Sequence, residues 1–275
     1  MDPIQLPKAL GVLLAALVAV ALMAPLAEAE TPAPGYSQFA GCPSPKSENP
    51  EITSCQRTVI TGGHFKMGSK DVPITEPIEL VGGTNEFAEN FAFNSKGGLL
   101  PAKQRVPGGV VGLTGLDWLL EFLSAEALEL YAVTELAGTP KIFGVEHVQL
   151  PIKVHLINPV LGDNCRVGSN SEPIALDLVT GTTSPPAPNE PITGKSPEPE
   201  FDPATHILHA NNGIFVDNSF AAPGANGCVL TLLGSLPVSL DDVINLASGL
   251  PSPAGSNETV QNFDLEVVAA ENVYP

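Results

Sequence analysis

Four cysteines and one proline-rich stretch place the tightest constraint on how this chain can fold. Cys42, Cys55 and Cys165 precede the segment 181–194, which contains four prolines, and Cys228 follows it. If all four cysteines are oxidised within the chain, one disulfide must span this segment whatever the pairing. A freely jointed linker is not normally bridged in this way. The segment is therefore predicted to be an ordered, extended connection inside one domain, reaching as far as residue 203.

The pairing itself is left open by the count, because four cysteines allow three connectivities. Cys42 and Cys55 enclose the turn-rich sequence PSPKSENPEITS, so a local bridge between them is the simplest choice. That choice assigns Cys165 to Cys228. No pair has the C-x-x-C spacing that is typical of metal or redox sites.

The N-terminal segment has the features of a secretory signal peptide. Residues 9–24 are an unbroken apolar run after Lys8, and Ala27-Glu28-Ala29 fits a cleavage site. The run is shorter than the roughly 20 residues that span a bilayer, although a retained anchor stays open as an alternative. We expect export, which favours disulfides over free thiols. The predicted organisation is a signal peptide at 1–29, an N-terminal disulfide hook at 30–56 and a single β domain at 57–275.

Hydrophobic alternation predicts that the domain is built of short strands. The clearest case is 148–158, in which every second residue from Val148 to Leu156 is apolar. Pro151 lacks an N–H, so we expect this strand at an edge or a bulge. The other candidate strands are 57–67, 72–83, 86–95, 128–136, 173–179, 205–210, 213–218, 228–233 and 259–269. The predicted fold class is all-β: a β-sandwich or open barrel of about ten short, mainly antiparallel strands, with two short apolar helices packed on it.

The two helices are predicted at 116–128 and 239–248. In the second, Ser239 is a good N-cap, two aspartates occupy the first turn, and Gly249 suits the C′ position. Both helices have apolar arcs, and we expect them to pack together against one end or face of the scaffold. The candidate residues for an apolar contact or pocket are Trp118, Leu119, Phe122, Leu123, Leu240, Val243, Ile244 and Leu246.

Composition narrows the classes of partner. The formal charge is −18, and it becomes −17 when residues 1–29, with two acidic and one basic side chain, are removed. Such acidity disfavours nucleic acid. The chain has no H-E-x-x-H, G-x-S-x-G, G-x-G-x-x-G or P-loop sequence, so no catalytic residue, metal ligand or cofactor site is predicted. One Trp and three Tyr are too few to favour a carbohydrate-binding cleft.

Three stretches of the sequence carry a resemblance. They are GDNCRVGSNSEPIALDLVTGTTSPPAPNEPITG at 162–194, VDNSFAAPGANGC at 216–228 and LYAVTELAGTP at 130–140. Together they resemble a group of uncharacterised secreted proteins of high-GC Gram-positive bacteria. The resemblance implies a location outside the cytoplasm and no mechanism. It also implies that Cys165 and Cys228 lie inside recurrent local patterns.

The leading expectation is a non-catalytic, exported cell-envelope or extracellular β protein that acts by surface binding or assembly. The first alternative is a carrier of a small apolar ligand or lipid, with the two helices as a lid. The second is a secreted hydrolase without a recognisable motif. The expected partners are an apolar small molecule, a lipid or a cell-envelope component.

Overall fold

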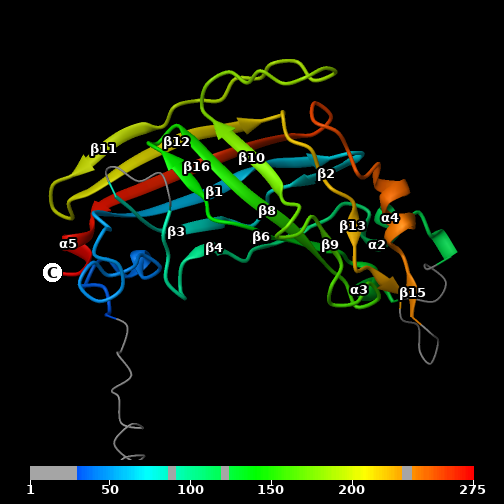
Figure 1. Cartoon of the computed structure of the whole chain (residues 1–275), viewed down its shortest axis with the longest axis horizontal. Coiled ribbons are helices and arrows are strands. Elements are labelled where there is room, and N and C mark those ends of the chain that lie inside the picture. Colours follow the sequence, from blue (N-terminus) through cyan, green and yellow to red (C-terminus); the bar gives the residue numbers. More distant parts are fainter. Residues whose placement is uncertain (1–29, 86–90, 119–123, 231–236) are drawn as a thin grey trace, which may run out of the picture. The chain divides into compact units, whose positions relative to one another are not determined.

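The alternating segment at 148–156 forms the centre of a long strand, β8 (His147–Ile157). Its five alternate apolar residues are all buried, at 7% exposure or less, whereas the residues between them are half-buried or exposed. This burial pattern confirms the predicted strand. The computed structural model describes residues 30–85, 91–118, 124–230 and 237–275 (Figure 1). The predicted signal peptide, and Leu119, Phe122 and Leu123 of the first predicted helix, lie outside these residues.

Fourteen strands form one antiparallel sheet with the order β13-β9-β8-β10-β12-β16-β1-β3-β4, to which β2, β5, β6, β7 and β11 are attached. Besides β8, the strands are β1 (Ser54–Met67), β2 (Lys70–Pro73), β3 (Ile78–Thr84), β4 (Gly98–Leu100), β5 (Lys103–Arg105), β6 (Tyr131–Leu136), β7 (Lys141–Phe143), β9 (Arg166–Val167), β10 (Ile174–Val179), β11 (Glu198–Asp202), β12 (Ile207–Asp217), β13 (Ala225–Asn226) and β16 (Glu258–Ala269). A separate pair is formed by β14 (Val229–Leu230) and β15 (Val238–Ser239). The all-β prediction is confirmed, and the open barrel describes the curled sheet better than the sandwich does.

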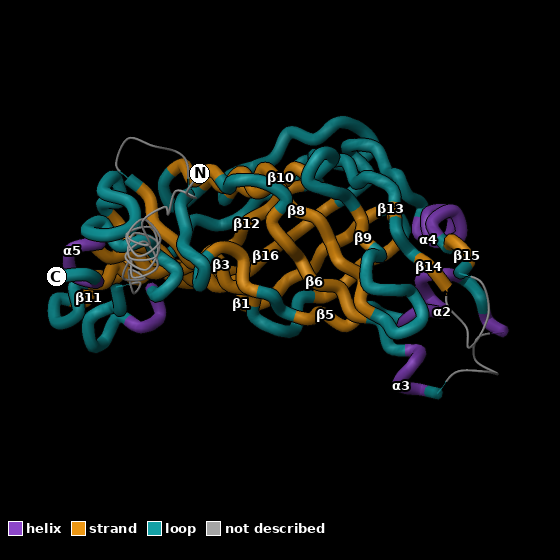
Figure 2. Tube along the Cα trace, turned by 60° about the horizontal axis from the view of Figure 1, so that its bottom comes forward, coloured by secondary structure: helices purple, strands orange, loops and turns teal. Residues whose placement is uncertain are grey.

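The curl originates beside β16. The pairing of β16 shifts register against β1 between Ile60 and Gly62, and against β12 between Ala210 and Gly213. Such bulges increase the local twist of a sheet. Gly63 follows the first bulge with a φ of +112°, and a Cβ there would lie 1.9 Å from a backbone oxygen of β16. The curvature brings β4 against β6 and β2 against β5, although the main sheet path separates these strands. Figure 2 shows the curled sheet from another side.

The second shift lies inside β12, which the sequence had divided into two strands, 205–210 and 213–218. Gly213 faces the ring of Phe263, and a Cβ at this position would come within 2.4 Å of that ring. Glycine therefore lets the strand continue past the aromatic side chain as a single element.

Pro151 does not place β8 at an edge. The strand pairs with β9 and β10 on one side and with β6 and β7 on the other. The carbonyl of Pro151 accepts from Ala137 N, between the end of β6 and the start of β7. The N–H and C=O of a strand residue point to the same side, so the missing donor faces this interruption. Proline is tolerated because the neighbouring ladder is already broken there.

The helices correct the sequence prediction in three ways. The segment 116–128 is not one helix, since Ser124 has extended backbone and caps α3 (Ala125–Leu128) by accepting from Ala127 N. A short helix, α2 (Gly109–Thr114), was not predicted. The second predicted helix is α4 (Asp241–Ser248), capped by Leu240 rather than Ser239, and it ends at Gly249 as expected. It packs against α2, which in turn packs against α3.

The compact unit formed by residues 31–275 is packed differently at its two ends. At one end, residues 33–53, α5 (Ala270–Val273) and the disulfide Cys42–Cys55 enclose a second apolar core around Phe39 and Tyr274. At the other end, where α2 and α4 lie in Figure 1, the disulfide Cys165–Cys228 joins the segments after β8 and before β14. Both predicted disulfides are present, which is typical of proteins from an oxidising compartment. Among the described residues, no helix is long and apolar enough to cross a membrane.

The proline-rich segment is held by hydrogen bonds along its length. Thr182 pairs with Thr193 in an isolated β-bridge, and the amide of Asn189 donates to the carbonyls of Asn218 and Asn257. The proline-rich connection was predicted to reach residue 203. It ends earlier, because β11 occupies Glu198–Asp202 and pairs with β12.

Candidate ligand cavity

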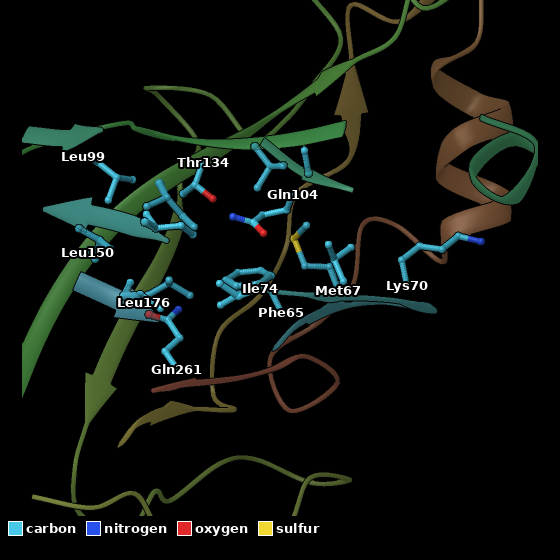
Figure 3. A pocket seen from close by; sticks show the side chains of 16 residues that line it. Phe65, Met67, Lys70, Ile74, Leu99, Gln104, Thr134, Leu150, Leu176 and Gln261 are labelled. Atoms are coloured by element: carbon cyan, nitrogen blue, oxygen red, sulfur yellow. The ribbon is translucent and has the colours of Figure 1, made fainter. Parts of the chain in front are cut away.

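The curled sheet encloses a small apolar cavity between strands from its two sides (Figure 3). Its volume is about 70 Å³. The lining residues are predominantly aliphatic: Ile60, Phe65, Met67, Lys70, Val72, Ile74, Ile78, Leu99, Gln104, Ala132, Thr134, Leu150, Ile152, Val154, Leu176 and Gln261. They come from β1, β2, β3, β4, β5, β6, β8, β10 and β16 and from the loop after β2. The strands, rather than the helices, therefore build the cavity.

Gln104 closes one wall of the cavity with its side chain. Its Oε1 accepts from the backbone N of Thr75 at 2.8 Å and of Glu76 at 3.0 Å. Its Nε2 donates to the carbonyl of Glu76 at 2.7 Å. These bonds join β5 to the loop between β2 and β3, across the seam where the curled sheet approaches itself. The amide thus provides the hydrogen bonds that a neighbouring strand would otherwise provide.

Gln261 contributes a different polar group from β16. Its side chain is 4% exposed, and its Nε2 donates to the hydroxyl of Thr259 at 3.1 Å. Its Oε1 is buried and has no hydrogen-bond partner among the described residues. In Figure 3 the Gln261 amide lies near Leu176, whereas Gln104 and Thr134 approach from the other side of the view. Buried acceptors are rarely left unpaired, so this oxygen marks the cavity as a candidate binding site.

The tip of the β1–β2 hairpin connects the cavity to the helices. Phe65, Met67 and Lys70 line the cavity from this hairpin. The turn between the two strands is fixed by Ser69 N, which donates to Ser248 O of α4 at 2.9 Å. The ammonium of Lys70 donates to Gly112 O of α2 at 2.7 Å and points towards the helices in Figure 3. The two helices therefore hold the hairpin that covers the cavity, and none of the described residues of α2 or α4 lines it.

The candidate residues from the sequence do not form this cavity. Leu240 and Ile244 are buried in the main core, at 4% and 0% exposure, and Val243 packs against that core. Leu246 is 87% exposed and Trp118 is 43% exposed. Leu246 follows Ile244 by two positions, or about 200° around the helix, so the two cannot share a face. The face that α4 buries is therefore narrower than the predicted apolar arc, which included Leu246.

A weak signal for Gln261 was present in the sequence. In β16 the buried residues alternate as Thr259, Gln261, Phe263 and Leu265. Gln261 is therefore in phase with the apolar positions, where a polar residue needs a reason. The apolar residues of this alternation predict the strand, and the polar Gln261 in register with them is the signal for the site.

The titratable groups lie outside the cavity, apart from Lys70. His147 contacts Asp177 at 2.7 Å, and His64 lies between Asp71 and Glu258 at 3.3 and 3.4 Å. Among the described residues, no three His, Cys, Asp or Glu side chains are grouped so that they could hold a metal ion.

Asp217 is a buried carboxyl whose pKa is raised. Burial disfavours its charged form and raises its pKa, although Asp177 N and Ser219 N donate to its two oxygens at 2.8 Å each and act in the opposite direction. Its residue exposure is 1%. It does not line the cavity.

No family model, curated protein or solved structure matches this chain.

Proposed function

We propose that this chain is an exported, non-enzymatic β protein that binds a small apolar molecule inside the curled sheet. The observation that carries the proposal is the apolar cavity of about 70 Å³ with an unpaired buried acceptor in its wall. Ligand sites commonly combine apolar walls with a few fixed polar groups. Export is supported by the two disulfides and by the signal-like sequence at 1–29.

The size of the cavity limits the ligand. Its volume is about half that of an engineered apolar cavity that binds benzene. A long lipid chain therefore does not fit unless the walls move. Phe65, Met67 and Leu99 are half-buried side chains on the wall, and methionine is flexible enough to adjust to an occupant. A compact molecule of about five or six carbon atoms, accommodated by movement of these side chains, suits this space best.

The proposal is tested by filling the cavity. Ala132 lines the cavity from β6, so Ala132→Leu should place a larger side chain inside it. Ala175 on β10 is exposed, and Ala175→Leu is the matched control. Thermal unfolding and calorimetric titration with cyclopentane, methylcyclopentane and cyclopentanol should show binding to the wild type and to Ala175→Leu. Binding should be lost in Ala132→Leu.

Two results would contradict this proposal. One is a wild-type protein that binds no member of the series, and the other is unchanged binding in Ala132→Leu. Native mass spectrometry of protein recovered from culture supernatant gives a second measurement. The expected result is a chain that begins at Glu30, carries two disulfides and retains a small ligand.

A second candidate function is contact with a macromolecule through the end of the unit that carries α2 and α4. Leu246, Val238 and Trp118 belong to this region of the fold, and they are 87%, 57% and 43% exposed. Exposed large apolar residues are typical of contact surfaces when they are grouped. Sedimentation velocity across a concentration series tests self-association of this kind. Leu246→Glu should abolish it if α4 carries the contact, and the cavity titrations should be unaffected.

A further inference from the structure

We propose that Gln261 makes the cavity selective for a neutral ligand that carries one hydroxyl group on a compact apolar body. The inference rests on the proposed function, because it concerns the chemistry of the molecule that enters the same cavity. Its basis is Gln261, which lines the cavity and whose buried Oε1 has no hydrogen-bond partner among the described residues. A carbonyl oxygen can only accept, so the ligand has to supply the donor.

The orientation of the Gln261 amide follows from its neighbours. The hydroxyl of Thr259 donates to the carbonyl of His64 at 2.9 Å, and a carbonyl can only accept. The same hydroxyl oxygen must therefore accept from Gln261, 3.1 Å away, which requires Nε2 on that side. A flipped amide would place two acceptors against each other. The oxygen is thus the atom of this amide that is left unpaired among the described residues.

The second glutamine of the cavity cannot take the same role. Both oxygen and nitrogen of the Gln104 amide are bound to the backbone at Thr75 and Glu76. A ligand that used Gln104 would have to open the seam of the sheet. Of the two glutamines, only Gln261 is therefore assigned the role of selecting a ligand that donates a hydrogen bond.

Other occupants fit the wall less well. An ordered water usually needs two to four polar partners, and most of the described lining is aliphatic. An ammonium group would be buried without a carboxylate, since none lines the cavity among the described residues. A carboxylate has no proton to donate and would meet an acceptor at Gln261. It could pair only with Lys70, whose ammonium already donates to Gly112 O beside α2.

The experiment compares two ligands of similar shape, cyclopentanol and methylcyclopentane, in which a hydroxyl replaces a methyl group. The measured quantity is the ratio of their dissociation constants in the wild type and in Gln261→Met. Removal of one neutral hydrogen bond should change this ratio by about tenfold against the alcohol. Binding of methylcyclopentane should stay the same or become tighter. Thr134→Val removes another polar group from the cavity wall and should leave the ratio unchanged.

Three results would overturn the assignment. They are a ratio that is unchanged in Gln261→Met, an equal change in Thr134→Val, or a preference for butyrate over 1-butanol that disappears in Lys70→Met. If the wild type binds neither cyclopentanol nor methylcyclopentane, the proposed function itself fails, which is a distinct outcome.

A measurement on the wild type alone keeps the test independent of the variants. The side-chain carbonyl carbon of Gln261, followed by NMR, should shift with cyclopentanol and much less with methylcyclopentane. Equal shifts with both ligands would contradict a hydrogen bond to this oxygen.

Discussion

Two walls of the same cavity each carry a buried glutamine, and the two residues differ in what they bind. Gln104 and Gln261 are both 4% exposed. The amide of Gln104 makes three hydrogen bonds to backbone groups and one to the Thr75 hydroxyl, which join the seam of the curled sheet. The amide of Gln261 makes one, and its oxygen has no partner among the described residues. Burial alone therefore does not separate a structural polar residue from a binding one, whereas the hydrogen-bond partners do.

The largest effect on the free energy of unfolding is expected from the two disulfides. Cys165 and Cys228 are separated by 63 residues, for which the chain-entropy model gives about 4 kcal/mol of stabilisation. Replacing both by Ser should lower the free energy of unfolding by about this amount, measured by urea denaturation. The pair Cys42 and Cys55 is separated by 13 residues and should contribute less, about 3 kcal/mol. The reverse order would show that loop length does not govern their contributions.

The next largest effect on stability is expected from Gln104, which lies in one wall of the cavity. Gln104→Met should lower the free energy of unfolding by about 1–3 kcal/mol, because the seam loses its hydrogen bonds. Hydrogen exchange of the Thr75 and Glu76 amides should become faster, since both donate to Gln104. An unchanged stability and exchange rate would mean that water replaces this side chain without loss.

The matching change in the other wall should have a smaller effect. Gln261→Met removes one hydrogen bond but also the unpaired acceptor. The free energy of unfolding should therefore change by about 0.5 kcal/mol or less. Urea denaturation of both variants under the same conditions measures the difference. A loss in Gln261→Met as large as that in Gln104→Met would contradict the separation of their roles.

The smallest effect concerns a buried acceptor away from the cavity, Asp217. Burial raises its pKa in the folded state above the ordinary value of 3.8. The folded state therefore keeps the proton longer than the unfolded state does. The stabilisation from this group is complete below pH 3.8 and is lost as the pH rises through the folded pKa.

Asp217→Asn isolates this contribution, because asparagine does not titrate. The stability of the wild type relative to Asp217→Asn, from urea denaturation at a series of pH values, should fall as the pH rises above about 4. A difference that rises with pH over that range would mean that the two backbone donors outweigh burial.

The sequence was informative where a pattern had one physical cause. Alternation identified β8 because its inner face is buried along the whole strand. The turn-rich loop between Cys42 and Cys55 predicted a local bridge, which assigned Cys165 to Cys228, and both disulfides are present. The glycine after α4 marked its end because the backbone there has a φ of +66°.

The remaining features depend on contacts between distant segments. Gln104 closes the seam because the bulges beside β16 curl the sheet, and no local pattern near residue 104 shows this. Leu246 was grouped with Leu240 and Ile244 in one apolar arc, because a helical wheel does not show which neighbour the helix meets. The cavity was missed for the same reason, since its lining comes from nine strands and one loop.

A crystal structure of the wild-type protein with cyclopentanol tests the central claim most directly. The account predicts density for the alcohol among Ile74, Leu150 and Leu176, with its hydroxyl within hydrogen-bond distance of Gln261 Oε1. A cavity that contains only ordered water, while the alcohol binds elsewhere or not at all, would contradict it.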